Sequence, residues 1–398
     1  MAETLAKGLG GLTRDAGSGA DGRRRVTFLT DIPTPYMLEV LDALAGIVEL
    51  TVLFCAQTGS RAMPWSRGGR HRFRHQVIDG LTIRSGSPDG ADYYLSPRIL
   101  AALARSRPDA VISAGYSIPT AFAAVYGRLS GAPLIIYSDG TSHYERNLRR
   151  HQLLARAVLL RAASTCVAKS RPAAERFMEL GVAPDRVFLA PHSSTMDRLW
   201  RIARERDYEC PERFTVLSAG RLVPHKGVDR LLVAAARVEV GHPRIRLVIA
   251  GSGPESERLR RLAGELGLED VQFRGFVDHA DMPGLYAEAD AFAFPTFDDP
   301  FGIVLLEAAA AGLPLIASWH AGAAWDLIRE GEAGVIVDPA DAAGFASALG
   351  SLAGDAARRR RLGRSAHRAT LSRSPLDSAR GYVSAIETAL GDRRRARA

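Results

Sequence analysis

The segment from 295 to 308, with the sequence PTFDDPFGIVLLEA, combines residue types that can bind a nucleotide-sugar. Its two carboxylates, Asp299 and Glu307, have seven residues between them, which corresponds to about 12 Å along a helix. A nucleotide-sugar spans a similar distance between its hexose and its ribose, and both sugars offer hydroxyl groups to carboxylates. Gly302 lets a ligand approach the backbone, and the N–H groups at a helix start favour a diphosphate.

Local structure can also explain this segment. We expect Pro300 in the first turn of the helix, with the preceding Asp299 as its cap. The spacing is then equally compatible with a packing helix that carries a capping Asp and a surface Glu.

A second segment, from Gly220 to Gly227 with the sequence GRLVPHKG, directly follows a predicted strand. Its Arg221 and Lys226 can place two cations on a leaving diphosphate at the carboxyl end of that strand. Negative charge develops there when a glycosidic phosphate bond breaks. The alternative is an exposed loop with solvated charges, but the flanking glycines and the buried strand before them favour a functional site.

Two further turns follow the next strands of the same half. The sequence IAGSGP at 249–254, which contains Gly251, resembles a phosphate-binding turn. It lacks the third glycine of the dinucleotide fingerprint, which argues against NAD. The sequence RGFV at 274–277 can offer backbone groups and the edge of Phe276 to a base, with Val277 beside it, although a packing Phe and a turn glycine explain it equally well.

Composition is that of a globular protein. The chain has 398 residues, 46% hydrophobic and 24% charged, which suits two domains with sizeable cores. The formal net charge of +8 suits anionic partners such as nucleotides, phosphates, acidic lipid surfaces or nucleic acid, without choosing among them. The arginine runs at 358–361 and 393–395 are interpreted as a solvated helix face and a charged tail.

The three cysteines, Cys55, Cys166 and Cys210, are far apart and show neither metal-type nor redox-type spacing. A disulfide framework is therefore not expected, and a reducing cytoplasm fits best. The sequence contains no apolar stretch long enough to span a bilayer. Residues 1–21 lack the apolar core of a signal peptide and are predicted to be a flexible tail.

Alternating strands and helices predict two doubly wound α/β domains that face a cleft. The first half has predicted strands at 25–30, 49–54, 110–113, 133–137 and 186–190, with helices at 37–47 and 118–130. The second half has predicted strands at 214–218, 246–250, 271–274, 291–294, 314–317 and 333–337, with helices at 227–240, 255–266, 282–289, 301–311 and within 342–390. Residues 191–213 are predicted to be a linker, and 61–74 a long basic loop.

Taken in this order, the segments resemble the retaining glycosyltransferases of family 4, which share the GT-B fold of two Rossmann-like domains around a central cleft. The family pattern is Glu, seven residues, Glu, with Phe-Gly inside, and here Asp299 replaces the first Glu. By this resemblance, Arg221 and Lys226 bind the donor diphosphate and Asp299 contacts the donor sugar, so these three are the expected catalytic residues. The resemblance adds donor-binding residues around the ribose, the phosphates and the base: Gly220, Gly251, Phe276, Val277, Phe301, Gly302, Ile303 and Glu307.

The resemblance also implies a division of the chain. After a tail (1–22), an acceptor domain covers 23–195, a donor domain covers 196–375, and a C-terminal helix with a basic tail (376–398) crosses back. The family often has a Gly-Gly loop after the first strand and a catalytic His after a later one, whereas here the loops read TDIPTPY (30–36) and YSDGTSH (137–143). No catalytic His is transferred, and the acceptor-side or cleft candidates are Thr34, Tyr36, Tyr116, Asp139 and His143.

Three further features are interpreted more plainly. His192, in the sequence PHSS, stands at the family's interdomain turn, and a hinge role is favoured over catalysis. The adjacent Asp298 and Asp299 are a weak metal signal, and the resemblance implies neither a bound metal nor another cofactor. The basic, Leu-rich helix predicted at 146–161 can touch a membrane, but packing of its leucines on the sheet is favoured.

The predicted function is transfer of a hexose-type sugar, with retention, from a UDP- or GDP-sugar to a hydroxyl acceptor. The acceptor is a sugar, a lipid-linked group or a small molecule, and no nucleic acid partner is expected. The predicted enzyme is cytoplasmic, with peripheral contact at the inner membrane face as an option. Alternatives are another GT-B enzyme, such as a sugar-nucleotide epimerase or a phosphorylase, or a silent scaffold subunit.

Overall fold

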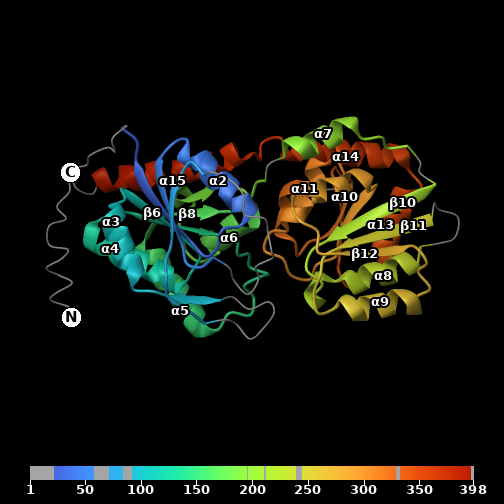
Figure 1. Ribbon diagram of the computed structural model, residues 1–398, viewed down its shortest axis with the longest axis horizontal. Coiled ribbons are helices and arrows are strands. Elements are labelled where there is room, and N and C mark those ends of the chain that lie inside the picture. The colour runs from blue at the N-terminus through green and yellow to red at the C-terminus, as the bar shows by residue number, and fades with distance from the viewer. Residues whose placement is uncertain are drawn as a thin grey trace.

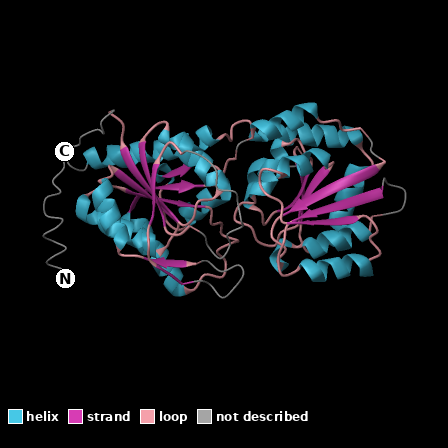
Figure 2. Cartoon of the chain, in the orientation of Figure 1, coloured by secondary structure: helices cyan, strands magenta, loops and turns pink. Residues whose placement is uncertain are grey.

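The computed structural model describes residues 22–57, 71–83, 92–194, 196–209, 212–238, 244–328 and 332–395. They form two α/β domains that lie side by side, each with a central sheet covered by helices on both faces (Figures 1 and 2). The predicted architecture of two doubly wound domains is therefore confirmed. Almost all of the predicted tail, Cys210 and residues 61–70 of the predicted basic loop lie outside the described residues.

In the described part of the first domain, the main sheet has seven parallel strands in the order β3-β2-β1-β6-β7-β8-β9. Its central strands are continuous apolar runs because helices cover both faces of a parallel sheet. The strands are β1 (Arg25–Thr30), β2 (Glu49–Phe54), β3 (Arg74–Val77), β6 (Ala110–Ala114), β7 (Leu134–Ser138), β8 (Ala163–Ala168) and β9 (Val187–Leu189), and β4 (Leu81–Ile83) pairs separately with β5 (Tyr93–Leu95). The helices are α2 (Pro35–Ala45), α3 (Arg98–Ser106), α4 (Ile118–Ser130), α5 (Arg150–Ala162) and α6 (Arg171–Glu179), with the 3-10 turn η1 (Pro184–Arg186).

The second domain has a parallel sheet whose described strands follow the order β12-β11-β10-β13-β14-β15. Helix α11 (Ile303–Ala310) is apolar around its whole circumference except for Glu307, as expected for a helix inside a core. The strands are β10 (Arg213–Ala219), β11 (Arg244–Ala250), β12 (Val271–Gly275), β13 (Ala291–Phe294), β14 (Leu315–Ser318) and β15 (Gly334–Val337). Its other helices are α7 (Asp197–Glu205), α8 (Val228–Ala236), α9 (Ser256–Glu265), α10 (Met282–Glu288), α12 (Gly322–Leu327), α13 (Ala342–Ala353) and α14 (Ala356–Thr370), with the 3-10 turn η2 (Pro224–Lys226), and the chain then continues into α15 (Pro375–Arg395).

The segment predicted to be a linker, 191–213, contains a helix. Residues 197–205 form α7, and Met196 and Leu199 are buried in the core of the second domain. Charged residues on the solvent side of α7 alternate with these apolar residues, as in other amphipathic surface helices.

The C-terminal helix α15 returns to the first domain, where it packs beside α2 and against β8 and β9 (Figure 1). Its Tyr382 and Ile386 are buried in the first core, and Thr165 donates a hydrogen bond of 3.1 Å to the carbonyl oxygen of Ala385. The two chain crossings between the domains meet, since Ser193 Oγ donates to the carbonyl oxygen of Arg373 at 2.7 Å. Across the described residues, no helix has both the length and the apolar character needed to cross a bilayer.

Candidate functional site

A cleft of about 870 Å³ opens between the domains, with walls from both of them. On the second domain, its lining comes from the loops that follow β10, β11, β12 and β13. These are the carboxyl ends of parallel strands, where open α/β sheets bind ligands. All eleven predicted catalytic and donor-binding residues line this one cleft, namely Gly220, Arg221, Lys226, Gly251, Phe276, Val277, Asp299, Phe301, Gly302, Ile303 and Glu307.

Lys226 and Asp299 form an ion pair inside the cleft. Lys226 Nζ lies 2.7 Å from Asp299 Oδ2 and donates a second hydrogen bond of 3.1 Å to the carbonyl oxygen of Asp298. Only 13% of the lysine side chain and 18% of the aspartate side chain are exposed. The predicted diphosphate cation and the predicted sugar-binding carboxylate are therefore direct neighbours, so a bound donor would contact both.

The expected capping role of Asp299 is wrong in detail. Helix α11 begins at Ile303 with Gly302 as its N-cap residue, so Pro300 precedes the helix and does not stand in its first turn. Asp299 Oδ1 instead accepts a hydrogen bond of 3.0 Å from the backbone N–H of Phe301 and fixes the loop before the helix. Gly302 takes φ +86°, where a Cβ atom would lie 2.9 Å from the ring of Phe294. The first N–H groups of α11 therefore face the cleft without an intrahelical partner.

Two glycines bring the loops after β10 and β11 into contact. A Cβ atom on Gly251, which has φ +150°, would lie 1.8 Å from the carbonyl oxygen of Gly220. The backbone of Gly220 has φ +148°. Only residues without a side chain allow this approach, so the wall beside Arg221 is bare backbone that a phosphate or a base can reach.

Glu307 is buried, which rules out the alternative of a surface Glu on a packing helix. Tyr286 donates a hydrogen bond of 2.8 Å to Glu307 Oε2, and His279 Nδ1 lies 3.4 Å from Oε1. Burial raises the pKa of Glu307 above its ordinary value, and the imidazole of His279 opposes this. The carboxylate is thus held in a fixed direction, and His279 stands beside it in the cleft lining.

The acceptor-side candidates divide into two groups. Tyr36 and Asp139 line the cleft, whereas Thr34, Tyr116 and His143 are not among its lining residues. Thr34 is the N-cap residue of α2, and its carbonyl oxygen accepts from the helix. The ring of Tyr116 is covered by the guanidinium of Arg156 at 4.6 Å.

His143 has a role between the domains instead. Its Nε2 donates to the carbonyl oxygen of Phe297 at 3.0 Å, and its ring stacks on His320 with 3.7 Å between the ring centroids. It therefore joins the first domain to the second next to the cleft. Sequence reasoning placed this residue near the site but could not identify its partner, because the two segments are 154 residues apart.

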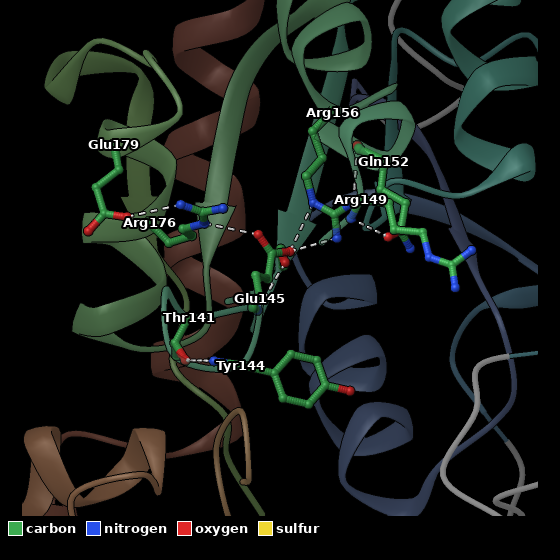
Figure 3. Close-up of polar contacts among 10 residues, drawn as sticks. Thr141, Tyr144, Glu145, Arg149, Gln152, Arg156, Arg176 and Glu179 are labelled. Carbon is green, nitrogen blue, oxygen red and sulfur yellow. Dashed lines mark hydrogen bonds and ion pairs between the residues drawn. The ribbon is translucent and has the colours of Figure 1, made fainter. Parts of the chain in front are cut away.

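A buried carboxylate that the sequence did not reveal organises the acceptor-side wall. Glu145 accepts from Arg156 at 2.8 Å and 3.0 Å and from Arg176 at 2.9 Å (Figure 3). Arg156 thereby lines the cleft in a fixed position, together with Tyr144 and Gln152. The three charged residues come from a loop, from α5 and from α6, so no local pattern could have found them.

The weak metal signal at Asp298 and Asp299 has another explanation. Asp299 pairs with Lys226, and Asp298 Oδ2 lies 3.2 Å from Arg146 Nη1 in the first domain. Among the residues that the structure describes, no group of three or more His, Cys, Asp or Glu side chains is arranged to hold a metal ion.

Comparison with known proteins identifies the family. The model of the group 1 glycosyl transferases matches residues 204–369, and the model of the glycosyl transferase 4-like domain matches residues 33–192. The chain belongs to this glycosyltransferase family. The two matches fall on the two domains, and the donor residues on the second domain lie within the first match.

Curated relatives of this glycosyltransferase act on different substrates. The chain is 37% identical over 168 residues to a glycogen synthase from Mycobacterium tuberculosis, which covers 42% of this chain and 40% of the relative. It is 33% identical over 240 residues to a GDP-mannose-dependent α-(1-6)-phosphatidylinositol monomannoside mannosyltransferase from the same species, which covers 56% of this chain and 61% of the relative. The chain thus spans about half the length of the curated relatives it matches.

Solved structures with low sequence identity share the whole two-domain fold. The Anabaena protein Alr3699/HepE in complex with UDP has a TM-score of 0.73 at 18% identity, over 92% of this chain and 100% of that one. A sucrose-phosphate synthase from Thermosynechococcus elongatus has a TM-score of 0.66 at 19% identity, over 94% and 98% of the two chains. The predicted GT-B fold is confirmed.

Proposed function

We propose that this protein is a retaining glycosyltransferase that moves a hexose-type sugar from a UDP- or GDP-sugar to a hydroxyl acceptor. The observation that carries the proposal is the meeting of Arg221, Lys226, Asp299 and Glu307 in one cleft at the carboxyl ends of parallel strands. Similar proteins provide a precedent for each nucleotide, since one relative is named as GDP-mannose-dependent and one structural neighbour was crystallised with UDP. Retention is what the family resemblance implies.

In this proposal, the second domain holds the donor by its nucleotide. Glu307, fixed by Tyr286, would accept hydrogen bonds from the ribose hydroxyl groups. The bare backbone around Gly251 and the residues Phe276 and Val277 would flank the base. The diphosphate would lie on the open N–H groups at the start of α11, between the ribose site and Lys226.

Chemistry would proceed on the diphosphate side of the sugar. The bond between the anomeric carbon and the diphosphate oxygen breaks while the acceptor hydroxyl oxygen bonds to the same face of that carbon. Arg221 and Lys226 would stabilise the charge that develops on the leaving diphosphate, which can itself take the proton of the acceptor hydroxyl. Asp299 would accept a hydrogen bond from the transferred sugar and keep it against the leaving group.

We further propose that the reaction needs neither a bound metal nor another cofactor. The support is that two side-chain cations and the start of α11 line the cleft in which the diphosphate is proposed to lie. Both carboxylates of the Asp298 and Asp299 pair are held by basic side chains. Turnover should therefore survive dialysis against EDTA, and a requirement for added Mg²⁺ would contradict this part of the proposal.

The proposed acceptor is a sugar or a lipid-linked hydroxyl compound that reaches the cleft from a membrane surface. Helices α3, α4 and α5 and strands β4 and β5 carry six arginines and no aspartate or glutamate. Leu154 on α5 is 65% exposed, and other large apolar side chains of this face are also exposed, namely Leu81, Ile83, Tyr93, Leu95, Val125, Leu129, Leu153 and Val158. Only the C-terminal leucines of α5, Leu159 and Leu160, pack inward as the sequence favoured.

This basic and apolar face, made by α3, α4, α5, β4 and β5, fits the surface of an anionic bilayer. Tyr93 on β5 and Gln152 on α5 belong to the same elements and line the cleft. An acceptor held at the bilayer would therefore enter beside the predicted acceptor residues. We propose a cytoplasmic enzyme that binds peripherally to the inner membrane face.

Sedimentation with vesicles tests the membrane contact. The wild type should sediment with vesicles of phosphatidylcholine and phosphatidylglycerol but not with phosphatidylcholine alone. The variant Leu154→Asp/Val158→Asp should lose this binding, whereas Leu371→Asp, at an exposed leucine of the second domain, should keep it. If the double variant still sediments with the anionic vesicles, the face is not a membrane surface. The same holds if the wild type elutes as a dimer in gel filtration and the double variant as a monomer.

A panel of UDP-, GDP- and ADP-sugars tests the main proposal, with release of the nucleoside diphosphate as the readout. The wild type should hydrolyse one donor slowly. Arg221→Ala should lower this rate strongly, whereas Arg230→Ala, which changes a half-exposed arginine of α8, should leave it unchanged. Turnover without an acceptor to an epimeric sugar would indicate an epimerase, and consumption of free phosphate a phosphorylase. Absence of both binding and turnover across the panel would indicate a scaffold subunit.

A further inference from the structure

We propose that His192 contacts the transferred sugar, donating a hydrogen bond from Nε2 to one of its hydroxyl groups, which Asp139 binds from the other side. This inference rests on the proposed function and adds a substrate-binding residue of the first domain to the donor site of the second. The sequence favoured a hinge role for His192, and its place in the cleft lining is what points to a ligand.

The Nε2 atom of His192 is buried and has no hydrogen-bond partner within the described part of the chain. The residue is only 9% exposed, and Nε2 forms no hydrogen bond with any of the residues that the structure describes. Buried polar atoms are nearly always hydrogen-bonded in native proteins, because burial without a partner is destabilising. A buried, unpartnered nitrogen in the lining of a ligand cleft therefore indicates a contact that forms when the ligand binds.

The ring is held in place by contacts from both domains. Its centroid lies 4.5 Å from the ring of Phe301, which directly precedes the N-cap residue Gly302, and 5.7 Å from the ring of Tyr36. The backbone N–H of His192 donates to the carbonyl oxygen of Lys169 at 3.3 Å. The imidazole thus reaches from the first domain to Phe301, next to the proposed diphosphate site.

The distance to Asp139 suits a hydroxyl group between the two side chains. His192 Nε2 and Asp139 Oδ2 are 3.8 Å apart, which is too far for a direct hydrogen bond. A hydroxyl oxygen that enters about 2.8 Å from each atom would bridge them, accepting from Nε2 and donating to the carboxylate. The nearby carboxylate favours the tautomer that carries its proton on Nε2, as this arrangement requires.

Burial keeps the imidazole neutral. It lowers the pKa of His192, and the nearby Lys169 lowers it further, against the opposing effects of Asp139 and Asp299. Burial disfavours ionisation of Asp139, but the contact with His192 and a backbone hydrogen bond outweigh it and hold the pKa of Asp139 below its ordinary value. A neutral donor next to an ionised acceptor recognises a hydroxyl group and would not attract a second phosphate.

Binding measurements with two ligands separate sugar contact from other roles. Isothermal titration calorimetry measures the affinity for the nucleotide-sugar that the panel identifies and for the corresponding nucleoside diphosphate. The difference between the two affinities is the contribution of the sugar. His192→Phe keeps the aromatic packing and removes the nitrogen. It should leave the affinity for the nucleoside diphosphate unchanged and weaken the nucleotide-sugar by about tenfold, the loss typical of one hydrogen bond.

Two variants serve as controls. His192→Gln keeps an N–H donor and should retain most of the sugar-dependent affinity, and His151→Phe, at an exposed histidine outside the cleft, should behave as the wild type. If His192→Phe does not fold, His192→Ala provides the same comparison without added bulk. Equal weakening of both ligands would show a structural role, and unchanged binding of the nucleotide-sugar would show no contact; either result overturns the inference. A wild type that binds no donor of the panel would instead refute the proposed function itself.

Discussion

Replacing Lys226 by alanine should abolish most turnover while leaving the protein folded. In the structure, Lys226 Nζ is fixed at 2.7 Å from Asp299 Oδ2 and at 3.1 Å from the carbonyl oxygen of Asp298. It is therefore a preorganised cation at the place where the proposed leaving group develops its charge. Loss of one such preorganised donor lowers kcat by roughly 10²- to 10³-fold in desolvated sites, and a similar loss is expected here.

The same substitution should reduce stability only moderately. It removes the cation that pairs with Asp299, whose side chain is 18% exposed, but Asp299 Oδ1 still accepts from the N–H of Phe301 at 3.0 Å. Leaving a largely buried acceptor without its partner costs roughly 1–3 kcal/mol in the free energy of unfolding. The double variant Lys226→Ala/Asp299→Ala should recover part of this loss, since no unpaired carboxylate remains.

The assay is release of the nucleoside diphosphate under saturating donor, with urea unfolding of the same samples. Arg230→Ala is the matched control, because Arg230 is a cation of the following helix that contacts Asp229 at 3.6 Å outside the cleft lining. It should leave turnover unchanged. If Lys226→Ala keeps kcat within about tenfold of the wild type while folded, Lys226 does not stabilise the leaving group and the site is assigned wrongly.

Three further substitutions test other parts of the structure. Burial lowers the pKa of Lys169 from 10.5 to about 7. Between pH 7 and pH 10.5, Lys169 is protonated in the unfolded chain but not in the folded one. The free energy of unfolding of the wild type, relative to that of Lys169→Met, should therefore rise by about 1.4 kcal/mol per pH unit. Urea titrations at several pH values can measure this. Gly251→Ala should weaken binding of the nucleoside diphosphate in calorimetry, since its Cβ would lie 1.8 Å from the carbonyl oxygen of Gly220 and must displace that loop. Asp326 of the second domain contacts Arg171 of α6 in the first domain and Arg373 before α15, so Asp326→Asn weakens contacts that hold the two domains together. It should lower kcat, which depends on the position of both domains, but keep the affinity for the nucleoside diphosphate. An unchanged kcat would contradict this.

The donor wall could be predicted because its signals are local. Gly220 and Gly251 directly follow predicted buried strands, Gly302 lies in the loop after another, and parallel strands bring their carboxyl ends to one edge. The order of the strands then places loops that are far apart in the sequence next to one another. The contact between Gly220 and Gly251 follows from β10 and β11 being neighbours in the sheet.

The acceptor wall could not be predicted in the same way. Glu145 is bound by Arg156 and Arg176, which lie 11 and 31 residues further along the chain, and no spacing rule joins them. His192 was assigned to a hinge because it stands at the family's interdomain turn, whereas its surroundings in the cleft come from Asp139 and Phe301. Tertiary packing of separate elements decides these positions, so local pattern carries no information about them.

The way the domains are joined explains why donor and acceptor sites differ in this respect. The proposed nucleotide site lies almost entirely on the second domain, whereas His192 and Asp139 reach the proposed sugar from the first. The chain crosses between the domains twice, and the two crossings meet where Ser193 donates to the carbonyl oxygen of Arg373. Other contacts between the two walls, such as Arg146 with Asp298 and His143 with the carbonyl oxygen of Phe297, lie beside the cleft, so a change in the domain angle would alter the distance from the proposed acceptor site to the donor site. In this proposal nucleotide affinity and transfer rate are separable, which is why the experiments above measure both.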